Sequence, residues 1–160
     1  MIQGVTIKKL KIHQDEPDVY QPEVRPSILG EVVRVDEDYF TGFGQSTFTV
    51  AYKGTIKGFH KHEKQDDLWF VATGKALVVL YDARPDSPTY RQTQTLYAGA
   101  GDYKLIVIPI GVAHGYKVLS DEPVILFYHT TEPYNRENPD ERRMPYNDPS
   151  INFKWDKYDK

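Results

Sequence analysis

Apolar and polar residues alternate with a period of two wherever this chain shows a pattern, and that alternation restricts the fold more than any other feature. The segment TFTVAYKG places Phe48, Val50 and Tyr52 on one face of a predicted strand. Seven further segments are short, apolar and bounded by Gly, Pro, Asp or Ser: residues 27–35, 67–74, 76–83, 93–99, 104–109, 115–120 and 123–131. No segment carries an apolar stripe over three helical turns. These features predict an all-β sandwich or barrel.

One domain accounts for the whole chain, residues 1–160, because the length suits a single core and no linker interrupts the pattern. Residues 132–150 are polar and proline-rich, which predicts an irregular C-terminal arm. Within the arm, the run ERRMP (residues 141–145) is interpreted as a solvated basic cluster. The last residues, WDKYDK, are charged and are expected to fray.

Composition excludes several classes of site and partner. The sequence has no cysteine, so any metal ligands must come from His, Asp, Glu or amide groups. The formal net charge of −3 gives no reason to expect nucleic acid as a partner. No segment resembles a signal peptide or a membrane span, so we expect a cytoplasmic protein without a membrane partner.

Three histidines occur at informative spacings. His60 and His62 lie two residues apart, so they project from the same face of a strand. Gly54 precedes this pair, Asp67 and Gly74 follow it, and PIGVAH ends at His114. This order resembles the two motifs of the cupin superfamily, with Asp67 where glutamate is usual. The resemblance implies a jelly-roll β-barrel with an irregular C-terminal arm.

A metal site is one interpretation of these residues. In metal-binding cupins, the matching positions hold one divalent transition metal, and here they are His60, His62, Asp67 and His114, with Gln65 as a substitute for Asp67. The plainer interpretation is a surface strand that carries two solvated histidines.

A narrower resemblance covers about residues 26–155. The runs that carry it are RPSILGEVVRVDED, FGQSTFTVAYKGTIKGFHKHEKQ, VLYDARPDSPTY, IPIGVAHGYKVLS, LFYHTTEPY and YNDPSINFKW. They resemble, in the same order, the dTDP-4-dehydrorhamnose 3,5-epimerase family. The run from Asp82 to Thr89 and the run from Asn147 to Trp155 are the most specific. Residues 1–25 are then an N-terminal extension and residues 156–160 a tail.

Membership would imply an isomerase without a cofactor that moves protons on a nucleotide-linked 4-keto-6-deoxy sugar through an enolate. His60 matches the general base of the family and Tyr128 matches its general acid. The substrate-binding positions are Lys57, His62, Gln65, His114 and Tyr134. The family also implies a homodimer that exchanges a strand, for which the segment near residues 28–35 is the natural element.

The chain departs from the family pattern at the site itself. Lys57 replaces an arginine, His62 is additional, and Asp67 replaces a lysine. The sequence ends before the aspartate that pairs with the base in the family, so we expect His62, Asp66 or Asp67 to take its place. Three alternatives follow: a metal-dependent cupin enzyme, a sugar 3,4-ketoisomerase that uses the paired histidines, and a non-catalytic sugar-nucleotide-binding relative.

Overall fold

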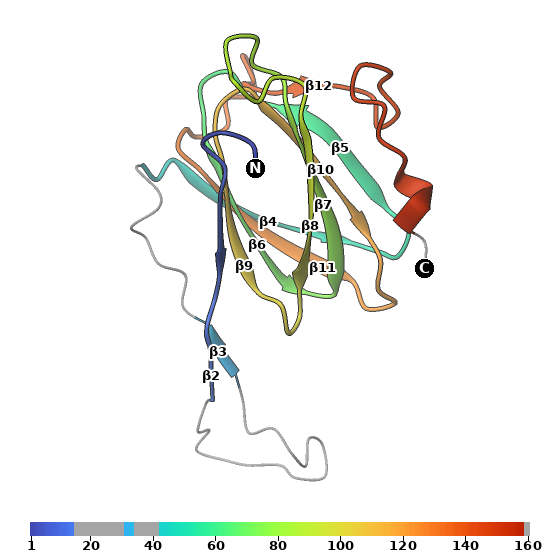
Figure 1. The fold of residues 1–160 in the computed structure, drawn as a ribbon. Coiled ribbons are helices and arrows are strands. Elements are labelled where there is room, and N and C mark those ends of the chain that lie inside the picture. Colours follow the sequence, from blue (N-terminus) through green and yellow to red (C-terminus); the bar gives the residue numbers. More distant parts are fainter. Residues whose placement is uncertain (15–30, 34–41, 159–160) are drawn as a thin grey trace.

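The computed structural model describes residues 1–14, 31–33 and 42–158. Two five-stranded antiparallel sheets face each other and form a flattened barrel (Figure 1). The first sheet has the order β1-β9-β6-β11-β4, and its strands are β1 (Thr6–Lys9), β4 (Gln45–Ala51), β6 (Asp67–Thr73), β9 (Lys104–Ile108) and β11 (Val124–Thr130).

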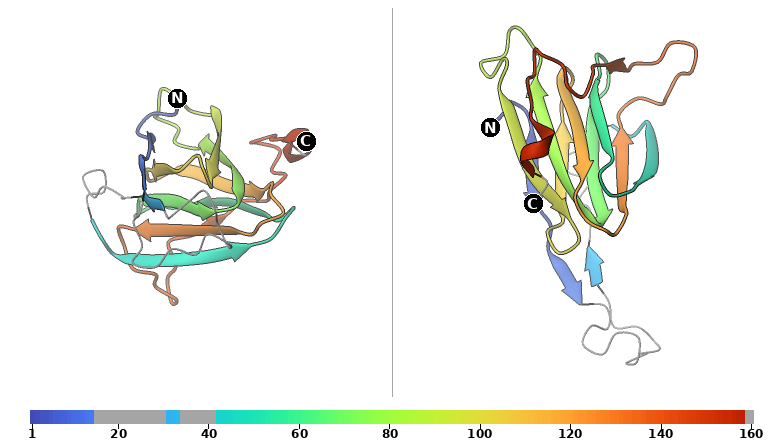
Figure 2. Two further views of the ribbon diagram at one scale, coloured as in Figure 1. Left: turned by 90° about the horizontal axis from the view of Figure 1, so that it is seen from below. Right: turned by 90° about the vertical axis from the view of Figure 1, so that its right-hand side faces the viewer.

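The second sheet has the order β12-β5-β10-β7-β8. Its strands are β5 (Ile56–Lys61), β7 (Lys75–Asp82), β8 (Thr93–Gly99), β10 (Val112–Val118) and β12 (Arg142–Arg143). A separate antiparallel pair, β2 (Ile12–Gln14) and β3 (Glu31–Val33), extends away from the barrel (Figures 1 and 2). The all-β class predicted from the alternation and the jelly roll implied by the cupin resemblance are both confirmed. Within the described residues, no helix is long and apolar enough to cross a membrane.

β7 is buried on both of its faces, which explains its nearly continuous apolar sequence. Val78 and Leu80 point into the core between the two sheets. Leu77 and Val79 point to the other side, into a second apolar cluster that includes Phe59 and Trp155. The C-terminal segment therefore covers the outer face of the second sheet, as the red end of the chain shows in Figure 2.

This cover corrects the expectation of a frayed tail. The ring of Trp155 lies 5.4 Å from that of Phe59, its indole N–H donates to the carbonyl of Tyr146, and only 5% of the residue is exposed. A short 3₁₀ helix, η2 (Trp155–Tyr158), follows from this anchor. Burial of the large aromatic ring of Trp155 stabilises this segment enough to order it, although the residues around it are charged.

Two strands, β1 and β3, also differ from the sequence expectations. β1, in the stretch expected to be an extension, pairs with β9 along the edge of the first sheet, and the neighbouring Ile2, Val5 and Leu10 are buried. Of the predicted strand at residues 27–35, only Glu31–Val33 lies within the described residues, where it forms β3. The other predicted strands are confirmed, except that β10 begins earlier than the predicted 115–120, at Val112, and ends at Val118, so it includes the end of the PIGVAH motif.

The turn after β7 is held by a single carboxylate. Asp82 accepts hydrogen bonds from the Arg84 guanidinium and from the hydroxyls of Ser87 and Thr89. Burial raises the pKa of Asp82, but these hydrogen bonds lower it by more, so the pKa lies well below its ordinary value. The family-like run that begins at Asp82 is therefore a structural turn.

Candidate active site

A pocket of about 680 Å³ opens between the two sheets, a size typical of small-molecule sites. Residues of β4, β6 and β11 line one wall, residues of β5 and β10 line the other, and the arm closes the mouth. All the site residues predicted from the sequence line this pocket: Lys57, His60, His62, Gln65, Asp67, His114, Tyr128 and Tyr134.

Two glycines let β5 and β10 approach closely enough to bring their histidines together. Gly58 has a φ of +147°, and a Cβ there would lie 2.8 Å from the Cα of Gly115. His60 and His114 are paired across these strands, and their ring centroids are 6.5 Å apart. Side chains larger than hydrogen at either glycine would force the strands apart.

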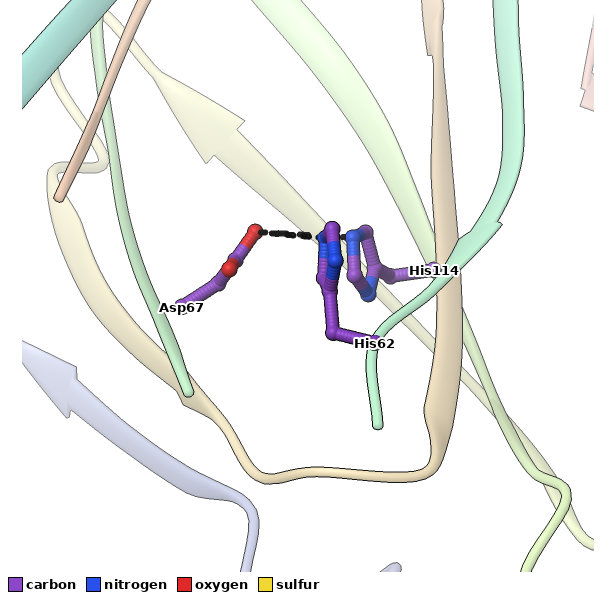
Figure 3. A group of neighbouring side chains, drawn as sticks. All are labelled: His62, Asp67 and His114. Atoms are coloured by element: carbon purple, nitrogen blue, oxygen red, sulfur yellow. Dashed lines mark ion pairs between the residues drawn. The ribbon is translucent and has the colours of Figure 1, made fainter. Parts of the chain in front are cut away.

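A buried cluster forms the floor of the pocket, where His62 and His114 face Asp67 from the opposite sheet (Figure 3). The Oδ2 atom of Asp67 lies 3.7 Å from Nε2 of His62 and 3.5 Å from Nε2 of His114. The amide of Gln65 and the indole N–H of Trp69 donate to the same carboxylate. Gln65 therefore holds Asp67 in addition to lining the pocket.

Backbone carbonyls orient both imidazoles of the cluster. Nδ1 of His114 lies 3.0 Å from the carbonyl of Val112, and Nδ1 of His62 contacts the carbonyl of Asp140. A carbonyl only accepts, so each Nδ1 carries the proton and each Nε2 points toward Asp67. Burial lowers the pKa of His114 to about 4, which keeps this ring neutral at physiological pH.

The cluster could hold a first-row divalent metal, because two imidazole nitrogens and one carboxylate oxygen lie within 4.8 Å of one another. His60 does not belong to this group, which corrects the four-residue metal set. His60 lies apart from the cluster because its Nδ1 atom faces a different carboxylate.

That partner is Glu141 of the arm. Nδ1 of His60 lies 3.3 Å from Oε2 of Glu141, while Nε of Arg143 lies 2.6 Å from Oε1. Burial raises the pKa of Glu141, but the Arg143 hydrogen bond and the charge of His60 more than offset it, so the pKa is below its ordinary value. The expectation that His62, Asp66 or Asp67 pairs with His60 is wrong.

Tyr128 comes from the opposite sheet to His60. It lies on β11, between Thr47 of β4 and Trp69 of β6, and its neighbours Leu126 and Thr130 line the same pocket. A small molecule bound between the sheets would have His60 on one side and Tyr128 on the other. That arrangement suits a base and an acid that act on opposite faces of one carbon atom.

The two remaining predicted binding residues, Lys57 and Tyr134, also line the pocket. Lys57 donates to the hydroxyl of Thr49, 2.8 Å away. Tyr134 is 63% exposed at the rim, and Gln45 accepts a hydrogen bond from its backbone N–H.

Sequence reasoning missed the acidic residues of the arm. Asp140 and Glu141 both line the pocket, and Arg143 joins them, although the ERRMP run was interpreted as a solvated cluster. Their only local signal is an acidic pair directly after Pro139. Nothing in that signal shows that the arm folds back over the histidines.

Comparison with known proteins agrees with this geometry. The family model described as dTDP-4-dehydrorhamnose 3,5-epimerase matches residues 1–160. The spore coat polysaccharide biosynthesis protein SpsL of Bacillus subtilis is 47% identical over 155 residues, which cover 97% of each chain.

Two solved structures are similar to this one. The dTDP sugar isomerase of Desulfovibrio desulfuricans has a TM-score of 0.82 and 26% identity, with 97% of this chain and 92% of that chain covered. The epimerase of Legionella pneumophila, solved with dTDP-4-keto-L-rhamnose, has a TM-score of 0.77 and 27% identity, with 94% and 78% covered. The chain is therefore an enzyme of the dTDP-4-dehydrorhamnose 3,5-epimerase family.

Proposed function

We propose that this enzyme epimerises a dTDP-linked 4-keto-6-deoxy sugar, with His60 as the general base and Tyr128 as the general acid. The observation that carries the proposal is that these two side chains reach one pocket from opposite sheets. Inversion at a carbon atom requires a proton to leave one face and another to arrive at the opposite face, and two walls of one pocket can provide this.

In the proposed reaction, Nε2 of His60 removes the proton from the carbon beside the ketone, and the electron pair moves into the carbonyl to form an enolate. The phenol of Tyr128 then returns a proton to the other face of the same carbon. Solvent reprotonates the tyrosine and takes the proton from His60. Lys57, on the pocket wall, supplies the positive charge that stabilises the enolate oxygen. These steps need no cofactor.

The nucleotide part of the substrate fits the chemistry of the mouth. Lys64 and Arg143 line it and would neutralise a diphosphate, and the exposed ring of Tyr134 offers a stacking surface for a base. The Legionella relative was solved with a dTDP-linked keto sugar.

The test is to incubate the protein with a dTDP-4-keto-6-deoxy sugar and follow the configuration at C3 and C5 by NMR. We expect inversion at one or both carbons, and we expect it to be lost in His60→Ala but kept in the control His129→Ala, whose histidine does not line the pocket. A ketone moved to C3 would instead identify a 3,4-ketoisomerase. Binding without turnover would identify a non-catalytic relative.

A metal-dependent enzyme is the second candidate, because the His62, Asp67 and His114 side chains converge without hydrogen bonds to one another. Elemental analysis of tag-free protein purified without chelator separates the two. About one equivalent of metal, lost together with turnover in Asp67→Asn, would favour this candidate. Full turnover in metal-free protein would exclude it.

We also propose that two copies pair through the outer face of the first sheet. Phe48 is 62% exposed there, its ring lies 5.7 Å from that of Phe127, and Val50 is also exposed. Exposed apolar patches on a sheet mark interaction surfaces. Sedimentation should give twice the mass of one chain for the wild type, and the mass of one chain for Phe48→Glu.

The cytoplasmic location stays a prediction from the sequence.

A further inference from the structure

The arm that closes the pocket carries two neighbouring carboxylates with different partners. We propose that Glu141 is a positioning residue for His60, and that Asp140 holds it in place by fastening the arm to the histidine segment. This inference rests on the proposed role of His60 as a base. In this proposal, the irregular arm contributes the residues that position His60.

Asp140 fastens the arm through its side chain and its main chain. Its carboxylate accepts hydrogen bonds from three successive backbone N–H groups, of Glu63, Lys64 and Gln65, at 3.0, 2.7 and 3.1 Å. Its carbonyl contacts Nδ1 of His62. Burial raises the pKa of Asp140, but the backbone hydrogen bonds lower it by more, so the carboxylate is ionised at neutral pH.

The next residues extend this attachment as a strand. Arg142 pairs with Lys61 and Arg143 pairs with His60 in the ladder between β12 and β5. Glu141 therefore lies between two fixed points, the Asp140 carboxylate on one side and the ladder on the other. Its backbone position relative to His60 is set before any substrate binds.

The two oxygens of Glu141 have separate partners. Arg143 donates to Oε1, which leaves Oε2 to face Nδ1 of His60. A carboxylate only accepts, so the Nδ1 atom of His60 carries the proton and Nε2 is left with its lone pair for the substrate. The negative charge also stabilises the imidazolium that forms when Nε2 takes a proton.

Three variants separate orientation from charge. Glu141→Gln keeps an acceptor but removes the charge, Glu141→Ala removes both, and Glu137→Gln is the control on the same arm, outside the pocket. We expect kcat to fall about 10-fold in Glu141→Gln and about 100-fold in Glu141→Ala, with KM within about twofold, as for partners that orient a functional histidine. The control should keep the wild-type kcat.

The second measurement needs no substrate. ¹⁵N NMR of labelled histidine, assigned with His60→Asn, reports which ring nitrogen of neutral His60 carries the proton. We expect the Nδ1–H tautomer in the wild type and in Glu141→Gln, and a loss of that preference in Glu141→Ala and in Asp140→Ala.

An unchanged tautomer in Glu141→Ala, or a variant effect on KM alone, would overturn the inference. The proposed function fails differently: the wild-type protein would not invert any sugar carbon, whatever the tautomer of His60. Retention of the wild-type tautomer in Asp140→Ala would overturn the fastening role of Asp140.

Discussion

Asp67 and His114 reach each other across the core, with Oδ2 of the aspartate 3.5 Å from Nε2 of the histidine. The aspartate comes from β6 in the first sheet and the histidine from β10 in the second. Both residues are almost fully buried. The two sheets therefore bring a carboxylate and an imidazole nitrogen close together at the floor of the pocket, without a hydrogen bond between them.

Asp67→Ala should lower the free energy of unfolding by about 3 kcal/mol, because it strips the partners from buried donors on Gln65 and Trp69. Urea denaturation followed by tryptophan fluorescence measures this difference. The control Asp121→Ala removes an ion pair to Lys53 that lies in water, and it should leave the unfolding midpoint unchanged. Equal midpoints for the two variants would contradict the structural role of Asp67.

Stability should fall on mild acidification because of His114. Burial lowers the pKa of this ring to about 4, against about 6.5 in the unfolded chain. Between these pH values the ring is protonated in the unfolded state but not in the folded state. The contribution of His114 to the free energy of unfolding is therefore complete above pH 6.5 and is lost as the pH falls toward 4. The loss is up to about 3 kcal/mol.

Urea denaturation at pH 7 and at pH 5 measures the effect, with His114→Gln as the comparison. The glutamine variant should be less stable than the wild type at pH 7 but should lose less stability between the two pH values. The same loss in both proteins would show that other groups cause the acid sensitivity.

Trp155→Ala should cost about 3 kcal/mol of stability, since it opens a cavity over Phe59 and removes the bond to the Tyr146 carbonyl. Phe59 lies next to His60 on β5, so turnover should fall as well. Tyr90→Ala, at an exposed aromatic residue, is the matched control and should change neither quantity. A Trp155 variant as stable as the control would mean that the tail does not hold β5.

Tyr128→Phe should reduce kcat by about 10²- to 10⁴-fold while KM stays within about twofold, because it removes the donated proton and keeps the ring that packs against the core. Steady-state kinetics on the dTDP-linked sugar provide the measurement. Tyr97→Phe removes a hydroxyl from an exposed residue on β8 and should have the wild-type kcat. If both variants turn over equally fast, another group delivers the proton.

The alternating pattern was enough to predict the all-β class, because most strands have one face toward solvent and one toward the core, or two buried faces as in β7. The jelly-roll arrangement followed only from the resemblance. β1 escaped prediction because TIKK is short, and its pairing with β9 involves residues almost a hundred positions away. Trp155 escaped because charged neighbours hide one large apolar side chain that packs on a distant strand.

At the site, spacing and resemblance predicted pocket residues from both sheets, from Lys57 to Tyr128, but not the further strand residues that line the walls, such as Thr49 and Tyr116. They did not predict Glu141, because the arm lacks periodicity and its path is set by the three backbone N–H groups that bind Asp140. The separation of His60 from the His62 cluster was also hidden, since residues two apart share a face but need not share a partner.

The most direct test of the account is solvent exchange on a dTDP-4-keto-6-deoxy sugar in D₂O, followed by NMR at C3 and C5. With the wild-type protein we predict deuterium at one or both of these carbons, and with His60→Ala we predict none. Deuterium incorporation that persists in His60→Ala at the wild-type rate would contradict the assignment of His60 as the base.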